Sequence, residues 1–405
     1  MESPFLFHTL PNGLQIIGQP THTRKSAAVG FFVKTGSRDE TAPESGVSHF
    51  LEHMLFKGTP KRSALELTFD MGNIGAQANA FTSEENTVYY GAVLPEYVSS
   101  LQEILSDMMR PALRQEDFDT EKQVILEEIA LYQDRPHFFL FENASKDFFA
   151  SHPAGNSVLG SPESIRALTS GTMRDYFGRR YSPTNVALVA AGNFDWQTFV
   201  ADADRLCGSW TRVETPRSTP QHSARSLRKE YRKKKLHQTH VLFMTDGASA
   251  QDEERFSLGL LATILGDSSG SKLYWALIDS GLADSAGTDT EERDGTGAFS
   301  AYASTESENL EKVASLMREI LARPLDFSAE DLERARTKTI TRMVRGNELP
   351  MGQLMALGLE WNARREVETL KETIERYKKV SRASIEAALK KYPLTTWSEF
   401  RLLPE

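Results

Sequence analysis

Hydrophobic positions near the start of the chain alternate with polar ones, as they do along strands with one buried face. Residues Phe5 to Thr9 and Leu14 to Ile17 flank the turn Pro11-Asn12-Gly13, and together they predict a hairpin. The segment from Ala27 to Thr35 is apolar almost throughout, which predicts a strand at the centre of a sheet. Threonine, valine and tyrosine are frequent from Asn79 to Leu94, which is typical of a strand pair.

Helical periodicity separates and follows these strands. Ser45 is a predicted N-cap for a helix that runs to about Lys57, before the helix breakers Gly58 and Pro60. The segments from Pro95 to Arg110 and from Glu116 to Asp134 predict two further helices. Strands and helices in this order favour an α+β fold over alternating βαβ units.

A polar segment divides the chain into two parts with the same layout. From Thr211 to Arg225 the sequence has two prolines, many hydroxyl groups and almost no apolar residues, which predicts a linker. Beyond it the order recurs as a strand (Thr239 to Met244), a helix (Glu253 to Leu265) and further strands (Leu282 to Ser304). We therefore expect two similar domains, each a mainly antiparallel sheet with helices packed on it. The expected boundaries are residues 1–213, a linker at 214–225, and residues 226–405.

Composition is that of an ordinary globular protein, with 40% of the 405 residues hydrophobic and 25% charged. The formal net charge of -9 argues against nucleic-acid binding, which needs an excess of Lys and Arg. The basic run from Arg228 to Lys235 is therefore interpreted as a solvated approach to a strand. No apolar run approaches the roughly 18 residues that a membrane helix requires.

The start of the chain and its cysteine content bear on localisation. Residues Met1 to Pro4 do not begin a signal peptide, because a basic region and a following apolar region are missing. A single cysteine, Cys207, excludes an internal disulfide and fits a reducing compartment. We therefore expect a cytoplasmic protein.

The helix predicted from Ser45 to Lys57 carries the residues with the clearest chemistry. His49 and His53 stand four positions apart, so both imidazoles project from one helix face and can reach one metal ion. Glu52 flanks the same face, where it can contact a metal-bound water without acting as a ligand. Zinc lowers the pKa of such a water and polarises a substrate carbonyl, and a carboxylate accepts the released proton. The spacing predicts a hydrolytic zinc centre with Glu52 as its base.

The plainer interpretation is an amphipathic helix that carries two histidines by chance, because the chain has nine histidines. A credible third ligand weighs against chance. Glu121 and Glu128 are seven positions apart on a predicted helix, so they share a face and suit one zinc ligand and one outer partner. Glu127 turns to another face and is interpreted as a solvated carboxylate.

With these residues the sequence resembles the inverted zinc peptidases of pattern H-x-x-E-H, and among them the pitrilysin (insulinase) family, which includes the mitochondrial processing peptidases. The resemblance covers essentially the whole chain and is strongest over residues 31–136. In that family the third ligand follows the second histidine by about 75 positions, which corresponds to Glu128, and an auxiliary catalytic glutamate corresponds to Glu121. The resemblance implies one zinc ion per chain, held by His49, His53 and Glu128.

The resemblance also implies how substrate binds. In the family a peptide adds as a strand to an exposed sheet edge beside the zinc ion, and the matching residues are Asn79, Ala80, Phe81 and Thr82. Main-chain pairing would supply most of the affinity, which suits extended peptides or small unfolded proteins. Without the resemblance, the same segment would be interpreted as an ordinary edge strand.

One feature departs from the family pattern. Members usually carry, in the second domain, an arginine and a tyrosine seven residues later that hold the substrate backbone. In this sequence Leu277 or Ile278 stands in the arginine position and Asp284 in the tyrosine position, so the pair is absent.

The family encloses its active site between two halves of two domains each, and this chain has the length of one half of that clamshell. The resemblance therefore implies a heterodimer with a paralogous subunit that keeps the Arg/Tyr pair, and a homodimer is the alternative.

We accordingly expect a zinc-dependent endopeptidase that forms the catalytic half of a dimeric chamber. Two alternatives stay open: a non-catalytic structural subunit of the same family, and a metal-binding or interaction module in which the motif is coincidental. Metal analysis separates the module from the other two, and peptide cleavage with the partner present separates the peptidase from the structural subunit.

Overall fold

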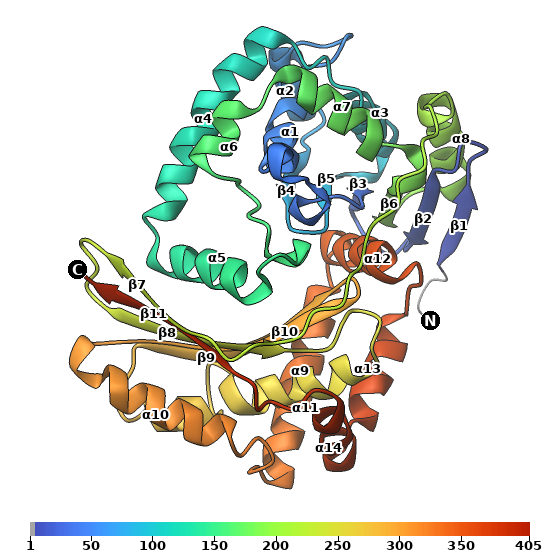
Figure 1. The fold of residues 1–405 in the computed structure, drawn as a ribbon. Helices are drawn as coiled ribbons and strands as arrows, with labels where there is room; N and C mark the ends of the chain where they lie inside the picture. The colour runs from blue at the N-terminus through green and yellow to red at the C-terminus, as the bar shows by residue number, and fades with distance from the viewer. Residues whose placement is uncertain (1–4) are drawn as a thin grey trace. The chain divides into compact units, whose positions relative to one another are not determined.

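The computed structural model describes residues 5–405 as two compact units (Figure 1). The start of the chain, Met1 to Pro4, which was considered for a signal peptide, lies outside the described residues. The first unit contains the chain up to residue 130 together with 156–218 and 345–367, and the second contains 131–155, 219–344 and 368–405.

The first unit is built on a six-stranded sheet with the order β1-β2-β6-β3-β5-β4. Its strands are β1 (Leu6–Thr9), β2 (Gln15–Pro20), β3 (Ala27–Val33), β4 (Gln77–Thr82), β5 (Thr87–Val93) and β6 (Val186–Gly192). Neighbours pair antiparallel, except that β2 and β6 run parallel. The predicted hairpin forms β1 and β2, and β3, predicted to be central, is buried along its whole length between β6 and β5. β4 is the last strand in the order.

Several helices of the first unit lie between these strands or directly after β6. They are α1 (Val47–Leu55), α2 (Ala64–Asn73), α3 (Val98–Met108), α4 (Gln115–Gln133), α6 (Pro162–Ala167), α7 (Ser170–Arg180) and α8 (Trp196–Cys207). The predicted N-cap of α1 was wrong, because Gly46 rather than Ser45 occupies that position, with φ +90°. The two side-chain oxygens of Glu40 accept the N–H groups of Gly46 (2.7 Å) and Ser48 (2.8 Å) and so replace the missing side-chain cap.

The second unit has a five-stranded sheet with the order β7-β11-β8-β10-β9. Its strands are β7 (Arg228–Lys233), β8 (Thr239–Asp246), β9 (Ser285–Arg293), β10 (Thr296–Thr305) and β11 (Ser398–Pro404). Its helices are α5 (Pro136–Phe149), α9 (Glu254–Gly266), a π-helical turn (Tyr274–Ile278), α10 (Leu310–Leu321), α11 (Ala329–Gly346), α13 (Leu370–Lys379) and α14 (Arg382–Lys391). No helix within residues 5–405 is both long enough and apolar enough to cross a bilayer.

The two sheets have the same topology. Without β1, the first sheet has the order β2-β6-β3-β5-β4. If β2 to β6 are matched in chain order with β7 to β11, this is the same order as β7-β11-β8-β10-β9 in the second sheet. The single parallel pair is also equivalent, since β2–β6 corresponds to β7–β11. The expected α+β fold with two similar domains is therefore confirmed. By this correspondence α9, between β8 and β9, is the counterpart of α1, and it carries no histidine.

Two helices pack on a different sheet from the elements that precede them in the sequence. α12 (Pro350–Arg364) packs Leu354 and Leu357 against Phe32 and Val189 of the first sheet. α5, in turn, packs against the second sheet, where its buried apolar side chains join the core. The compact units therefore interleave along the chain, whereas the expected boundaries divided it once, between residues 213 and 226.

Gly358 allows α12 to lie close against the first sheet. A Cβ at this position would lie 2.4 Å from ring atoms of Phe32, which is fully buried in β3. Gly358→Ala should therefore lower the free energy of unfolding by about 1–3 kcal/mol in urea denaturation, because the ring has no space to move into. The matched control is Gly178→Ala in α7, where nothing lies within 4 Å of the added Cβ and stability should stay the same or rise. Equal effects of the two substitutions would contradict this packing.

Candidate metal centre

Three side-chain donors converge in the first unit: His49 and His53 from α1 and Glu128 from α4. Nε2 of His53 lies 3.4 Å from Oε2 of Glu128, and Nε2 of His49 lies 3.7 Å from the same oxygen. All three donor atoms lie within 4.8 Å of one another. A tetrahedral zinc ion with bonds of about 2.0–2.1 Å places its ligand atoms roughly 3.3–3.4 Å apart. The cluster thus has nearly the spacing of zinc ligands.

The surroundings of Glu128 and His49 also fit a divalent metal. Oε2 of Glu128 is buried and has no hydrogen-bond partner among the described residues, although it faces both imidazoles. Burial lowers the pKa of His49 to about 3, with a smaller contribution from nearby His53, so this imidazole is neutral at pH 7. A neutral imidazole and a carboxylate oxygen that has no hydrogen-bond partner are both suited to bind zinc.

Glu121, two turns before Glu128 on α4, holds the second histidine in place. Its Oε1 lies 2.8 Å from Nδ1 of His53, and its Oε2 lies 2.5 Å from Nζ of Lys57. Burial raises the pKa of Glu121, but the hydrogen bond with His53 and the ion pair with Lys57 together lower it more, so this pKa is held below its usual range. A carboxylate at Nδ1 assigns the ring proton to that nitrogen and leaves Nε2 of His53 free to bind a metal.

Glu52 lies on α1 beside the donors but is not one of them. Its Oε2 accepts a hydrogen bond of 2.6 Å from Oγ1 of Thr82. Burial raises the pKa of Glu52, and the hydrogen bond from Thr82 opposes this with a smaller effect. A carboxylate whose pKa is raised toward neutrality is well suited to accept a proton as a general base.

Two contacts hold α1 against α4. The ring of Phe50 on α1 stacks on the ring of Phe118 on α4, with centroids 4.6 Å apart and an interplanar angle of 19°. Arg114, just before α4, donates to the carbonyl oxygens of Lys57 (3.3 Å) and Thr59 (2.9 Å), just after α1. The end of one ligand-bearing helix is thereby attached to the beginning of the other.

The residues predicted to bind peptide, Asn79, Ala80, Phe81 and Thr82, are the last four residues of strand β4. The N–H of Ala80 donates to Oδ1 of Asn79 at 2.9 Å, whereas the N–H of Ser83 donates across the hairpin to Asn86 at 2.8 Å. Because backbone donors alternate between the two sides of a strand, the N–H groups of Ala80 and Thr82 face away from β5. The strand therefore directs main-chain donors to its open edge, where the side chain of Asn79 occupies that of Ala80, and its end lies beside Glu52.

Sequence reasoning placed Glu127 in solvent, and its side chain is exposed. It missed Lys57, although Lys57 follows His53 by four positions and so continues the ligand face of α1. It also missed the contact between Thr82 and Glu52, for which the sequence has no local signal. That contact exists only because the sheet brings β4 beside α1.

The positions of the absent Arg/Tyr pair lie in the second unit. Leu277 belongs to the π-helical turn and is fully buried, and Ile278 is partly buried. Asp284 is exposed and accepts a hydrogen bond of 2.6 Å from Nε2 of Gln238. None of these three side chains can donate to a peptide carbonyl as arginine and tyrosine do.

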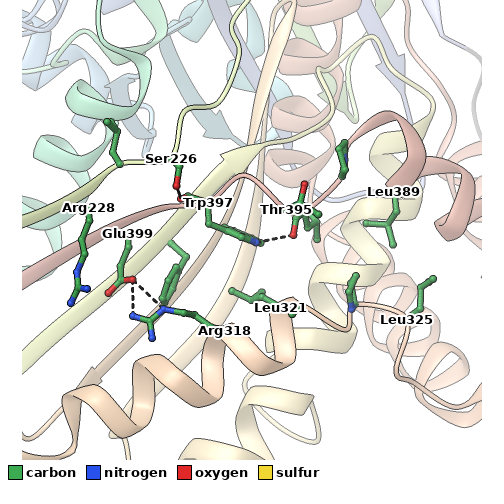
Figure 2. A pocket seen from close by; sticks show the side chains of 15 residues that line it. Ser226, Arg228, Arg318, Leu321, Leu325, Leu389, Thr395, Trp397 and Glu399 are labelled. Atoms are coloured by element: carbon green, nitrogen blue, oxygen red, sulfur yellow. Dashed lines mark hydrogen bonds and ion pairs between the residues drawn. The ribbon is translucent and has the colours of Figure 1, made fainter.

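A pocket of about 770 Å³ lies in the second unit, beside β7, β11 and the ends of α10 and α14 (Figure 2). Leucine and proline side chains line one part of it, and the charged groups gather at the other. Arg318 donates to Oε2 of Glu399 through Nε (3.2 Å) and Nη2 (2.8 Å), and Nε1 of Trp397 donates to Leu394 at 2.8 Å. These polar groups satisfy one another, and none of the three metal donors lies there, so the catalytic candidate remains the histidine cluster.

Comparison with known proteins gives the family of this chain. Residues 15–162 match the family described as insulinase (peptidase family M16), and residues 167–339 match the peptidase M16 inactive domain. The chain belongs to the insulinase family. The first of the two matched regions contains all three clustered donors, and the second contains the positions of the absent pair.

Relatives of this insulinase-family chain include proteins named as zinc proteases. YmxG of Bacillus subtilis, described as an uncharacterized zinc protease, is 33% identical over 78% of this chain and 77% of its own length. SCO5738 of Streptomyces coelicolor, with the same description, is 32% identical over 80% of this chain and 73% of its own length.

Solved structures share the fold at lower identity. A protease from Helicobacter pylori superposes with a TM-score of 0.90 over 100% of both chains at 19% identity. A peptidase M16 inactive domain from Pseudomonas fluorescens gives a TM-score of 0.90 at 15% identity, over 99% of this chain and 98% of its own. At these identities the likeness establishes the fold alone.

Proposed function

We propose that this insulinase-family chain is a zinc-dependent endopeptidase that cleaves extended peptides or small unfolded proteins. The observation that carries the proposal is the convergence of His49, His53 and Glu128 beside a carboxylate, Glu52, that stays outside the cluster. Three protein ligands that leave a fourth position open are typical of catalytic rather than structural zinc sites.

The residues divide the chemistry among them. A zinc ion held by His49, His53 and Glu128 would supply Lewis acidity toward a water molecule and the scissile carbonyl. Glu52 accepts the proton of the attacking water and then passes it to the leaving amine, which restores the carboxylate. The hydroxyl of Thr82 keeps Glu52 in one orientation between these two transfers.

Substrate binding is proposed to use the open edge of β4. A peptide that pairs with Asn79, Ala80, Phe81 and Thr82 would run along this edge, and at Thr82 it would reach the carboxylate of Glu52. Main-chain pairing binds any extended sequence without Pro at the paired positions, so we expect broad side-chain tolerance.

The first test distinguishes the proposed zinc ligands from the proposed catalytic base. His49→Ala and Glu128→Gln should sharply reduce the zinc content of the purified protein, because each removes one of three ligands. Glu52→Gln should keep about one zinc ion per chain and lose peptide hydrolysis, because it removes only the proton acceptor. Metal analysis after dialysis and a peptide-cleavage assay measure the two effects.

Glu127→Gln is the matched control for Glu128→Gln, since it changes the adjacent and exposed carboxylate of the same helix. It should alter neither zinc content nor hydrolysis. Full turnover by the Glu52→Gln variant would overturn the assigned base, and normal zinc content in Glu128→Gln would remove Glu128 from the ligands.

The edge-strand proposal is tested at Ala80. Ala80→Pro deletes an N–H that faces away from β5, so the ladder within the sheet is kept while a donor for substrate is lost. Peptide affinity should fall by about 3- to 10-fold at unchanged zinc content, as expected for one hydrogen bond. Ala80→Ser, which retains the N–H, should bind peptide normally. Equal affinities for the two variants would refute the model of strand addition.

We further propose that the active form is a heterodimer with a paralogous subunit that carries the Arg/Tyr pair. Leu277, Ile278 and Asp284 cannot supply the missing donors, and a homodimer would lack them on both sides. The proposed setting is the cytoplasm, where Cys207, buried and unpaired, would stay reduced.

The purified single chain should therefore bind zinc but cleave peptides slowly, at a rate about 10²- to 10³-fold below that of the mixture with its paralogue, because transition-state hydrogen bonds are missing. Initial cleavage rates with and without the paralogue measure the difference. A fast single chain that no partner improves would refute the heterodimer and leave the zinc centre standing. Zinc binding without cleavage, even in the mixture, would instead support the alternative of a non-catalytic structural subunit.

A further inference from the structure

Lys57 follows the ligand-bearing helix α1 and directs its ammonium group back toward the metal donors. Its Nζ lies 2.5 Å from Oε2 of Glu121, and the other oxygen of that carboxylate, Oε1, lies 2.8 Å from Nδ1 of His53. The carboxylate of Glu121 thus has one cationic or donor partner on each oxygen.

Both partners are needed because Glu121 is buried. Its side chain is only 4% exposed, so water cannot replace a lost partner without a structural change. A buried carboxylate held at one oxygen alone is free to rotate away from the imidazole or to draw water into the site. A second partner at Oε2 would therefore help Glu121 to hold the imidazole of His53 in one orientation.

The fold sets the reach of Lys57. Its N–H donates to the carbonyl of Met54 at 3.1 Å, and its own carbonyl accepts from Arg114 at 3.3 Å. Gly58 follows with φ +110°, where a Cβ would lie 2.7 Å from the carbonyl oxygen of Arg62. With the backbone held on both sides, the side chain starts from a fixed point and extends to Glu121.

We propose that Lys57 is a positioning residue of the metal centre. Its ammonium group fixes Glu121, Glu121 fixes the imidazole of His53, and that imidazole presents Nε2 to the metal. The inference rests on the zinc site proposed above and extends it by one residue, which acts through Glu121 rather than on the metal or the substrate.

A purely structural role for Lys57 makes a different prediction. A cation after the last turn of a helix interacts favourably with the helix dipole, and this would stabilise α1 whether or not Glu121 were present. Removing the charge would then lower the stability of the metal-free chain without a specific effect on metal affinity or coordination geometry.

The experiment is a double-mutant cycle on the full chain, read as zinc affinity in competition with a chelator and as the visible absorption of the Co²⁺-substituted protein. Lys57→Met should weaken zinc binding by about 10-fold, and Glu121→Gln by about 10- to 100-fold, as losses of outer partners commonly do. The double variant should bind no more weakly than Glu121→Gln alone, because both substitutions interrupt the same path. Lys57→Met should also shift the Co²⁺ bands, and Lys57→Arg should restore part of the affinity.

Lys61 provides the matched control, since its side chain is 77% exposed and its Nζ lies 4.0 Å from Asp107. Lys61→Met should leave zinc affinity and the Co²⁺ spectrum unchanged. The unfolding midpoint of each metal-free variant separates loss of fold from loss of affinity, and Lys57→Gln serves the same test should Lys57→Met not fold.

Wild-type zinc affinity in a folded Lys57→Met variant would overturn the proposal, as would losses that multiply in the double variant. Glu128→Gln is measured in the same series. If it loses zinc while Lys57→Met does not, only the role of Lys57 is refuted, and if it keeps zinc, the proposed metal site itself fails.

Discussion

The packing of α1 on α4 is the interaction on which the candidate centre depends. Two donors come from one helix and the third from the other, so no ion could be held unless the helices kept one relative position. The stacked rings of Phe50 and Phe118 set that position from the buried side. A slip of one residue along either axis would move a donor by about 1.5 Å, which is most of a zinc–ligand bond. The contact between these two apolar rings thereby determines the distances among the metal donors.

Polar side chains outside α1 secure this short helix at both ends. Glu40 accepts two N–H groups where α1 starts, at a glycine that offers no side chain of its own. Arg114 binds the carbonyl oxygens that follow its last turn and leads directly into α4. A helix of 9 residues is not stable in isolation, so its orientation must come from such contacts and from burial of its apolar face.

The duplicated topology shows how one architecture can separate two tasks. Both units place a helix between the second and third strands of the repeated set, as α1 in the first and α9 in the second. In α1 that helix presents His49 and His53, whereas α9 is largely buried and apolar. The second unit therefore has the same scaffold without the metal donors. Each sheet is also covered by a helix from a distant part of the sequence, since α12 packs on the first sheet and α5 on the second.

Local pattern identified several of the elements, among them α1 and α4, and the chemistry that lies within those two helices. Spacing along a helix decides which side chains share a face. The spacing of four residues therefore grouped His49 with His53, and the spacing of seven grouped Glu121 with Glu128 and excluded Glu127. The pairing of Glu128 with the histidines came from resemblance to a family, because nothing in the spacing brings residue 128 to residue 53.

Tertiary structure decided whatever depends on contacts between elements. It placed Glu40 at the start of α1, gave Lys57 its partner in Glu121, and set Thr82 on Glu52. It also placed α12 on the first sheet. This packing needs a glycine, Gly358, opposite Phe32, and the hydrophobic periodicity of the helix does not predict that glycine. Sequence periodicity reports which face of an element is buried, but the choice of partner for that face is made by the packing of the whole unit.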